Sequence, residues 1–227
     1  MGFHWTVFII GMALSLCAQA LVQANVARYS RVMAMSGLTG AQAARQTLDV
    51  HGLGHIRIEH ARGQLTDHFS PREGVLRLSD TTYGQSSVAA IGIALHEVGH
   101  AIQHQQGYWP NKFRTALLLP ANLGSQIGPL MAIIGLFMQS AIGDTIMYAG
   151  IFLFAFAVLF YLITLPVEFN ASHRAMQLID ERGYLTGDQR DGAKRVLRAA
   201  AMTYVASAVT AGLYLLRYIS LASSRRQ

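Results

Sequence analysis

The chain has 227 residues, of which 52% are hydrophobic and only 13% are charged. The charged fraction is about half of that in an ordinary soluble domain, and the mean hydropathy is +0.31. This composition excludes a disordered chain and a coiled coil, and the length fits a single domain over residues 1–227. The only cysteine, Cys17, excludes a disulfide framework and a cysteine-based zinc site. The formal net charge of +6 is, in so apolar a chain, typical of basic cytoplasmic loops rather than of nucleic-acid binding.

Four uncharged stretches are long enough to cross roughly 30 Å of hydrocarbon at about 1.5 Å per helical residue. They cover residues 5–24, 115–138, 146–165 and 199–216. The third stretch is the clearest, whereas Pro120 and Pro129 interrupt the second and predict a kinked span. The sequence therefore predicts a mainly α-helical membrane protein with about four transmembrane helices.

Lysine and arginine are unevenly distributed between the polar segments. Nine of the 18 lie in residues 25–114 and six lie in residues 166–198, whereas the short loop 139–145 has none. Cytoplasmic loops are enriched in these residues, so we expect segments 25–114 and 166–198 to face the cytoplasm.

The longer polar segment has the pattern of a small α+β unit. Thr39 and Gln42 form a capping-box pattern that predicts a helix running to about Val50. Residues 55–60, 65–69 and 75–78 are strand candidates, separated by glycine and proline. Two interpretations of 75–78 stay open: an edge strand that pairs with an extended peptide, or an ordinary core strand.

The pentapeptide HEVGH, at residues 96–100, lies within a helix predicted to run from about residue 88 past residue 103. Positions i and i+4 of a helix share one face, so His96 and His100 can bind one metal ion. Glu97 lies beside them, as the general base does in zinc hydrolases with the HExxH motif. The other interpretation is a helix whose histidines only form hydrogen bonds, and the small apolar residues before the motif favour the metal site.

A zinc site needs at least one further protein ligand. His104 lies eight residues beyond His96, or about 12 Å along the helix, which is too far to share the metal. Pro166 is expected to end the third span, so that Glu168 opens a new helix, either as a ligand or only as a helix-dipole residue. Two spans separate Glu168 from His100. Because an even number of crossings returns the chain to the same membrane face, the topology favours the ligand.

Several further residues are candidates for supporting the site. Ser172, four residues after Glu168, and the nearby Asn170 could hydrogen-bond a metal ligand. A protease also needs a donor for the oxyanion of the tetrahedral intermediate. The candidates for this role are His173, Arg174, Tyr83 and Tyr204.

Six stretches carry a resemblance to a known family and extend over nearly the whole chain. They are SGLTG at 36–40, LTDH at 65–68, VAAIG at 88–92, residues 96–103, residues 164–172 and TYVA at 203–206. At these residues the chain resembles the bacterial membrane neutral zinc metallopeptidases often called YugP-like. It is more distantly similar to HtpX-type and CaaX-prenyl-type membrane proteases, which share an HExxH helix and a later Glu-x-x-Ala-Asp helix whose Glu binds zinc. Glu168 matches that Glu, and Ser172 stands where that pattern has Asp.

The resemblance implies a zinc endopeptidase of the bacterial inner (plasma) membrane with a zincin-like polar portion. One Zn²⁺ per chain would be held by His96, His100 and Glu168, and a zinc-activated water would hydrolyse the peptide bond with Glu97 as general base. The expected partners are the lipid bilayer and a membrane-associated or unfolded polypeptide, with no nucleic acid. The alternative is a non-proteolytic membrane scaffold or chaperone with structural zinc. Structural sites usually have four protein ligands, so three candidates and an intact Glu97 favour the enzyme.

Overall fold

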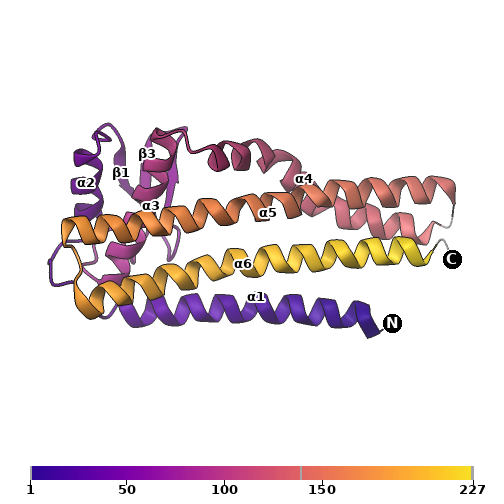
Figure 1. Ribbon diagram of the computed structural model, residues 1–227, viewed down its shortest axis with the longest axis horizontal. Coiled ribbons are helices and arrows are strands. Elements are labelled where there is room, and N and C mark those ends of the chain that lie inside the picture. The colour runs from indigo at the N-terminus through magenta and orange to yellow at the C-terminus, as the bar shows by residue number, and fades with distance from the viewer. Residues whose placement is uncertain (1, 139, 226–227) are drawn as a thin grey trace. The chain divides into compact units, whose positions relative to one another are not determined.

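The computed structural model describes residues 2–138 and 140–225, and its elements are labelled in Figure 1. In chain order they are α1 (Gly2–Tyr29), α2 (Gly40–Val50), β1 (Arg57–His60), β2 (His68–Ser70), β3 (Val75–Leu78), α3 (Val88–Gln105), α4 (Trp109–Phe137), α5 (Ala141–Arg182) and α6 (Gly187–Ser224). Within this part of the chain, α1, α4, α5 and α6 are long and apolar enough to cross a membrane. The prediction of a mainly α-helical membrane protein with four such helices and a small sheet is confirmed.

The chain divides into two compact units. The helical unit consists of residues 1–18, 109–166 and 203–227, and the α+β unit consists of residues 19–108 and 167–202. All the residues of the predicted site except Tyr204 belong to the α+β unit. That residues 1–227 act as one domain stays a prediction.

In the helical unit, α4 and α5 pack closely through glycines. A Cβ on Gly124 would overlap the carbonyl oxygen of Leu153, and a Cβ on Gly128 would lie 2.9 Å from the carbonyl oxygen of Gly150. Small residues at such contacts let two backbones approach closely, which is how transmembrane helices commonly pair.

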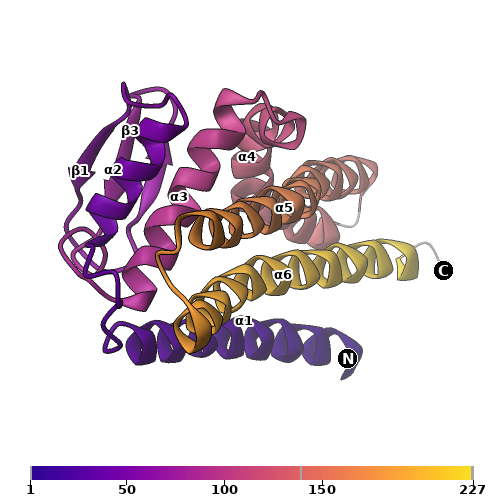
Figure 2. The same cartoon turned by 60° about the vertical axis from the view of Figure 1, so that its left-hand side comes forward.

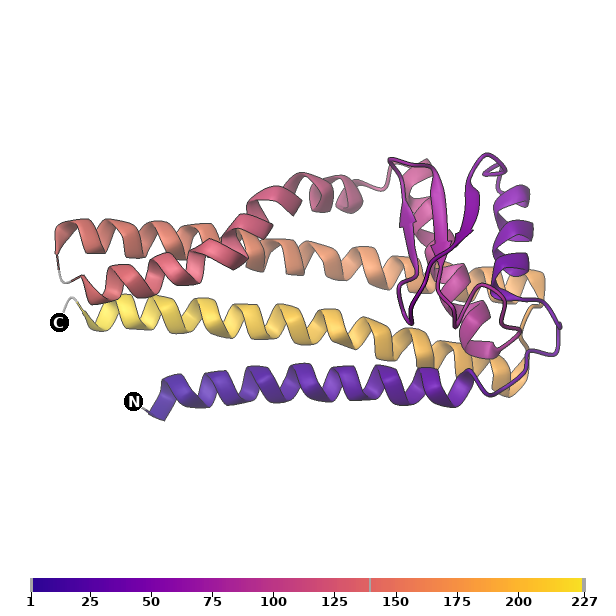
Figure 3. The same ribbon diagram turned by 180° about the vertical axis from the view of Figure 1, so that it is seen from behind.

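Proline does not end either of the helices that contain it. α4 continues through Pro120 and Pro129 and bends along its length, as Figure 3 shows. The prediction that Pro166 ends a span and Glu168 opens a new helix is wrong, because α5 runs unbroken from Ala141 to Arg182. A proline inside a helix costs about 3 kcal/mol. Burial of the turn that follows, including Val167 at 0% exposure, offsets that cost.

In the α+β unit the predicted capping box and three strands are confirmed, except that the second strand covers His68–Ser70 rather than residues 65–69. The Gln42 backbone N–H donates to Thr39 Oγ1 (3.2 Å), and the Thr39 backbone N–H donates to Gln42 Oε1 (2.9 Å). The sheet has the order β1-β3-β2, with β1 parallel and β2 antiparallel to β3. Residues 75–78 therefore form the central strand, and the interpretation of this segment as a peptide-pairing edge strand is wrong.

The site helix α3 is the most buried helix of the α+β unit. The hydroxyl of Ser87 accepts a hydrogen bond from the backbone N–H of Ala90 (3.2 Å) and caps its first turn. The helix packs against the sheet and against α2 (Figure 2). Its apolar residues on these faces, such as Ile91 and Leu95, are fully buried. This packing fixes the rotation of α3 about its axis, and hence the direction in which the HEVGH residues point.

α3 crosses α5 at a glycine. A Cβ built on Gly99 would lie 2.8 Å from the carbonyl oxygen of Ala171, so only glycine permits this approach without a shift of backbone. Ala171 and Ala175 are both fully buried on α5. The crossing therefore sets the distance between the histidines of α3 and Glu168 on α5.

Replacement of Gly99 by valine is expected to force α3 and α5 apart. Overpacking of this kind typically costs about 1–3 kcal/mol, and here it also moves Glu168 away from the histidines. We expect a lower midpoint of thermal unfolding and weaker zinc binding, measured on purified protein in detergent. Gly212→Val is the control, because a Cβ built on that helical glycine has no atom within 4 Å. Equal zinc affinity in the two variants would contradict the assignment of this role to Gly99.

Candidate metal centre

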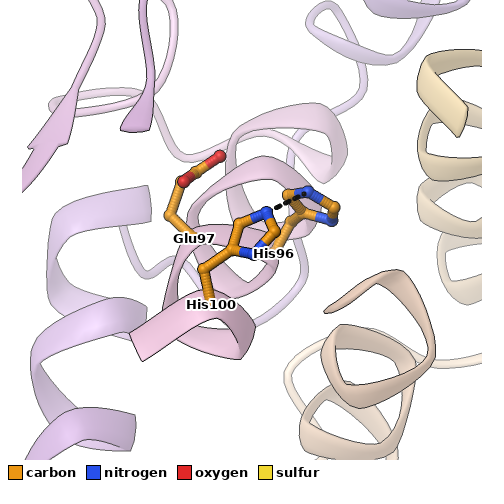
Figure 4. A group of neighbouring side chains, drawn as sticks. All are labelled: His96, Glu97 and His100. Atoms are coloured by element: carbon orange, nitrogen blue, oxygen red, sulfur yellow. Dashed lines mark hydrogen bonds between the residues drawn. The ribbon is translucent and has the colours of Figure 1, made fainter. Parts of the chain in front are cut away.

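His96 and His100 project from one face of α3, one turn apart (Figure 4). Their Nε2 atoms lie 3.1 Å apart, and the two rings are nearly perpendicular, at 89°. The two side chains are 14% and 13% exposed, so they are largely shielded yet still reachable from solvent. Two ring nitrogens this close favour a shared cation between them, because each can present a lone pair to it.

α5 brings Glu168 to this pair. Its Oε2 atom lies 3.3 Å from Nε2 of His96 and 3.5 Å from Nε2 of His100, and its side chain is only 3% exposed. A carboxylate buried to this extent requires compensating positive charge. The alternative role for Glu168, as a helix-dipole residue, fails because α5 begins at Ala141 and Glu168 lies deep inside it.

The three donor atoms form a nearly equilateral triangle with sides of 3.1, 3.3 and 3.5 Å. Zinc binds nitrogen and oxygen at about 2.0–2.2 Å in a tetrahedral arrangement, which places its ligand atoms about 3.3–3.6 Å apart. The two imidazole nitrogens and one carboxylate oxygen therefore fit zinc in chemistry and in spacing. Three protein ligands leave the fourth tetrahedral position open, as in catalytic zinc sites.

Glu97 lies beside the pair (Figure 4). It is 8% exposed, and His96, Glu97 and His100 offer ligand atoms that all lie within 4.8 Å of one another. Burial disfavours the charged form of His100. The hydrogen bond with Glu168 and the negative charges of Glu97 and Glu168 outweigh this effect and hold the pKa of His100 above its usual value. The surroundings of the triangle are thus electronegative and favour a bound cation.

The residues predicted to support the site divide into two groups. Ser172 Oγ lies 3.2 Å from Nδ1 of His96, as expected for a residue that orients a ligand. Asn170 is connected to a histidine through Gln103. Its Oδ1 accepts hydrogen bonds from Gln103 Nε2 (2.9 Å) and Arg174 Nε (2.8 Å). The guanidinium of Arg174 is therefore already engaged beside the site.

The oxyanion role of His173, Tyr83 and Tyr204 stays a prediction. His173 is exposed on α5, and the ring of Tyr83 lies 5.4 Å from the ring of His60, at the sheet. Tyr204 belongs to the helical unit. The oxyanion donor therefore stays unassigned among the predicted residues.

One residue of the site, Gln103, was not among the predicted site residues. Its side chain is fully buried, and its Oε1 atom lies 3.0 Å from Nδ1 of His100. A signal was present in the sequence. Gln103 is three residues after His100, so on a helix the two side chains lie on the same face.

Comparison with known proteins gives a consistent result. A family model described as "Putative neutral zinc metallopeptidase" matches residues 4–223. The chain is 44% identical over 213 residues to the "Putative membrane protease YugP" of Bacillus subtilis (strain 168), covering 94% of this chain and 93% of that protein. No solved structure matches the chain significantly.

Glu168→Gln tests the third corner of the triangle. The amide keeps the size of the side chain but removes the negative charge. Loss of a residue that only orients a ligand lowers metal affinity by roughly 10–100-fold, and we expect loss of the ligand itself to lower it further. Affinity is measured by competition with a chelating dye. The control is Glu181→Gln, an exposed glutamate on the same helix, which should bind zinc as the wild type does. Equal affinities of the two variants would exclude Glu168 as a ligand.

Proposed function

Because the chain belongs to the neutral zinc metallopeptidase family, we propose that it is a membrane zinc endopeptidase whose metal is bound by His96, His100 and Glu168. The observation that carries this proposal is the triangle of donor atoms, with the carboxylate of Glu97 beside it but outside it. Among the described residues, one group of His, Cys, Asp and Glu side chains could hold a metal ion, namely His96, Glu97 and His100, and this supports one zinc ion per chain.

Each residue has a distinct task in the proposed reaction. Zinc, when bound at the triangle, supplies a Lewis acid that polarises the scissile carbonyl and lowers the pKa of water to about 7. Glu97 accepts a proton from the water whose oxygen bonds to the carbonyl carbon. The same carboxyl then donates that proton to the amide nitrogen as the carbon–nitrogen bond breaks. The low exposure of Glu97 keeps the proton from exchanging freely with bulk water between these two steps.

The four apolar helices indicate that the enzyme works at a bilayer. We propose that its substrates are membrane-associated or unfolded polypeptides, because a peptide must be extended to reach donor atoms that are mostly buried. The excess of lysine and arginine in residues 25–114 and 166–198 supports a site that faces the cytoplasm from the inner membrane.

Glu97→Gln is the principal test of the reaction. The amide cannot accept a proton, so we expect cleavage of an unfolded casein-like substrate to fall by about 10²–10⁴-fold. Zinc content should stay at that of the wild type, because the triangle is intact. His96→Ala, by contrast, should lose zinc and cleavage together.

The comparison of these variants also separates the enzyme from the scaffold. Cleavage by Glu97→Gln at the wild-type rate would exclude Glu97 as general base. A Glu97→Gln variant that retains zinc and complements every cellular defect of a deletion strain would favour the non-proteolytic scaffold.

The orientation can be tested with single cysteines in a Cys17→Ser background. Ser36 is exposed in the α+β unit, and Ile142 is 67% exposed at the start of α5, beside the loop that lacks lysine and arginine. We expect a membrane-impermeant maleimide to label Ile142→Cys in intact spheroplasts and Ser36→Cys only after lysis. The reverse pattern would place the site outside the cytoplasm.

A further inference from the structure

Gln103 is a fully buried polar side chain whose nitrogen and oxygen both have partners. Its Nε2 donates to the backbone carbonyl of Val167 (2.8 Å) and to Oδ1 of Asn170 (2.9 Å). Its Oε1 lies 3.0 Å from Nδ1 of His100. A buried amide pays a substantial desolvation cost unless both ends are satisfied, so these contacts define one favoured placement.

The orientation of this amide follows from neighbours that have only one hydrogen-bonding role. The carbonyl of Val167 can only accept, so the atom of Gln103 that faces it is the nitrogen. Nε of Arg174 can only donate, so the atom of Asn170 that it contacts (2.8 Å) is the oxygen. That oxygen also accepts from Gln103. Two acceptors thus hold Nε2 of Gln103, and its Oε1 must face His100.

This orientation determines the tautomer of His100. The amide oxygen can only accept, so Nδ1 of His100 carries the hydrogen, and the lone pair of the neutral ring is on Nε2. Nε2 is the atom that lies 3.1 Å from Nε2 of His96 and 3.5 Å from Oε2 of Glu168. We propose that Gln103 is a positioning residue that commits His100 to binding the metal through Nε2. This inference rests on the proposed zinc site.

The two histidines differ in this respect. His96 has a hydroxyl, Ser172 Oγ, at 3.2 Å from its Nδ1. A hydroxyl can donate or accept, so it does not select a tautomer. The constraint at Nδ1 is therefore asymmetric. A directional series of hydrogen bonds that begins at Arg174 fixes the tautomer of His100, whereas the hydroxyl beside Nδ1 of His96 selects neither tautomer.

Gln103 also connects the two helices that supply the ligands. Val167, whose carbonyl it contacts, directly precedes Glu168 on α5. One side chain thus orients a ligand on α3 and holds the backbone next to a ligand on α5. The expected consequence of its loss is weaker metal binding, beyond any change in the stability of the metal-free protein.

The test uses the full chain in detergent and measures zinc affinity by chelator competition, with unfolding of the metal-free protein as a second readout. Gln103→Met keeps the length of the side chain but has no strong acceptor for Nδ1–H, and we expect affinity to fall by about 10–100-fold. Gln105→Met is the matched control, since Gln105 is exposed on the same helix and donates a hydrogen bond to the carbonyl of His51 (3.2 Å). Ser172→Ala is expected to lose less affinity than Gln103→Met.

Gln103→Glu separates the two functions of the side chain. It keeps an acceptor for His100 and loses both donors to α5, so we expect zinc affinity within about threefold of the wild type and a lower midpoint of unfolding without metal. A Gln103→Met affinity within about threefold of the wild type would overturn the proposal. If Gln103→Met does not fold, a loss of more than about tenfold in Gln103→Glu would overturn it. Failure of the proposed function is distinguishable, because the wild type would then bind no zinc.

Discussion

The close crossing of α3 and α5 is the constraint on which the site depends. Gly99 lets the backbone of α3 approach the carbonyl of Ala171, and this approach brings Glu168 within 3.5 Å of both imidazoles. Every other part of the site follows from it, because ligands carried by two helices 72 residues apart in sequence can share a metal only at one separation of those helices. The core of the α+β unit, which packs around α3, fixes that separation against thermal motion.

The parts of the molecule that depend on local chemistry were predictable from the sequence. The capping box at Thr39 and Gln42 and the i, i+4 spacing of His96 and His100 each need only a few neighbouring residues. The pairing of Glu168 with the histidines was also accessible, because counting membrane crossings places both segments on one face. These features depend either on residues close together in the sequence or on whether the number of membrane crossings between two segments is even.

The parts of the molecule that depend on tertiary packing were not predictable from the sequence. Pro166 alone favours a helix end, but burial of the following turn, including Val167, outweighs that local preference. The central position of β3 depends on which strands pair, and alternation within one strand carries no such information. Apart from its spacing from His100, nothing in the sequence distinguishes Gln103 from other polar residues, because the acceptors that orient its side chain lie on α5.

The donor set of the triangle contains nitrogen and oxygen but no sulfur, and the only cysteine of the chain, Cys17, lies on α1. Thiolate ligands are open to oxidation, which converts them to sulfenic acids or disulfides that no longer hold a metal in the same way. Imidazole and carboxylate ligands do not undergo this chemistry. Thiol oxidation therefore cannot release a metal ion from this site, and protons and competing chelators, rather than the thiol–disulfide balance of the cell, would govern how well the site retains the ion.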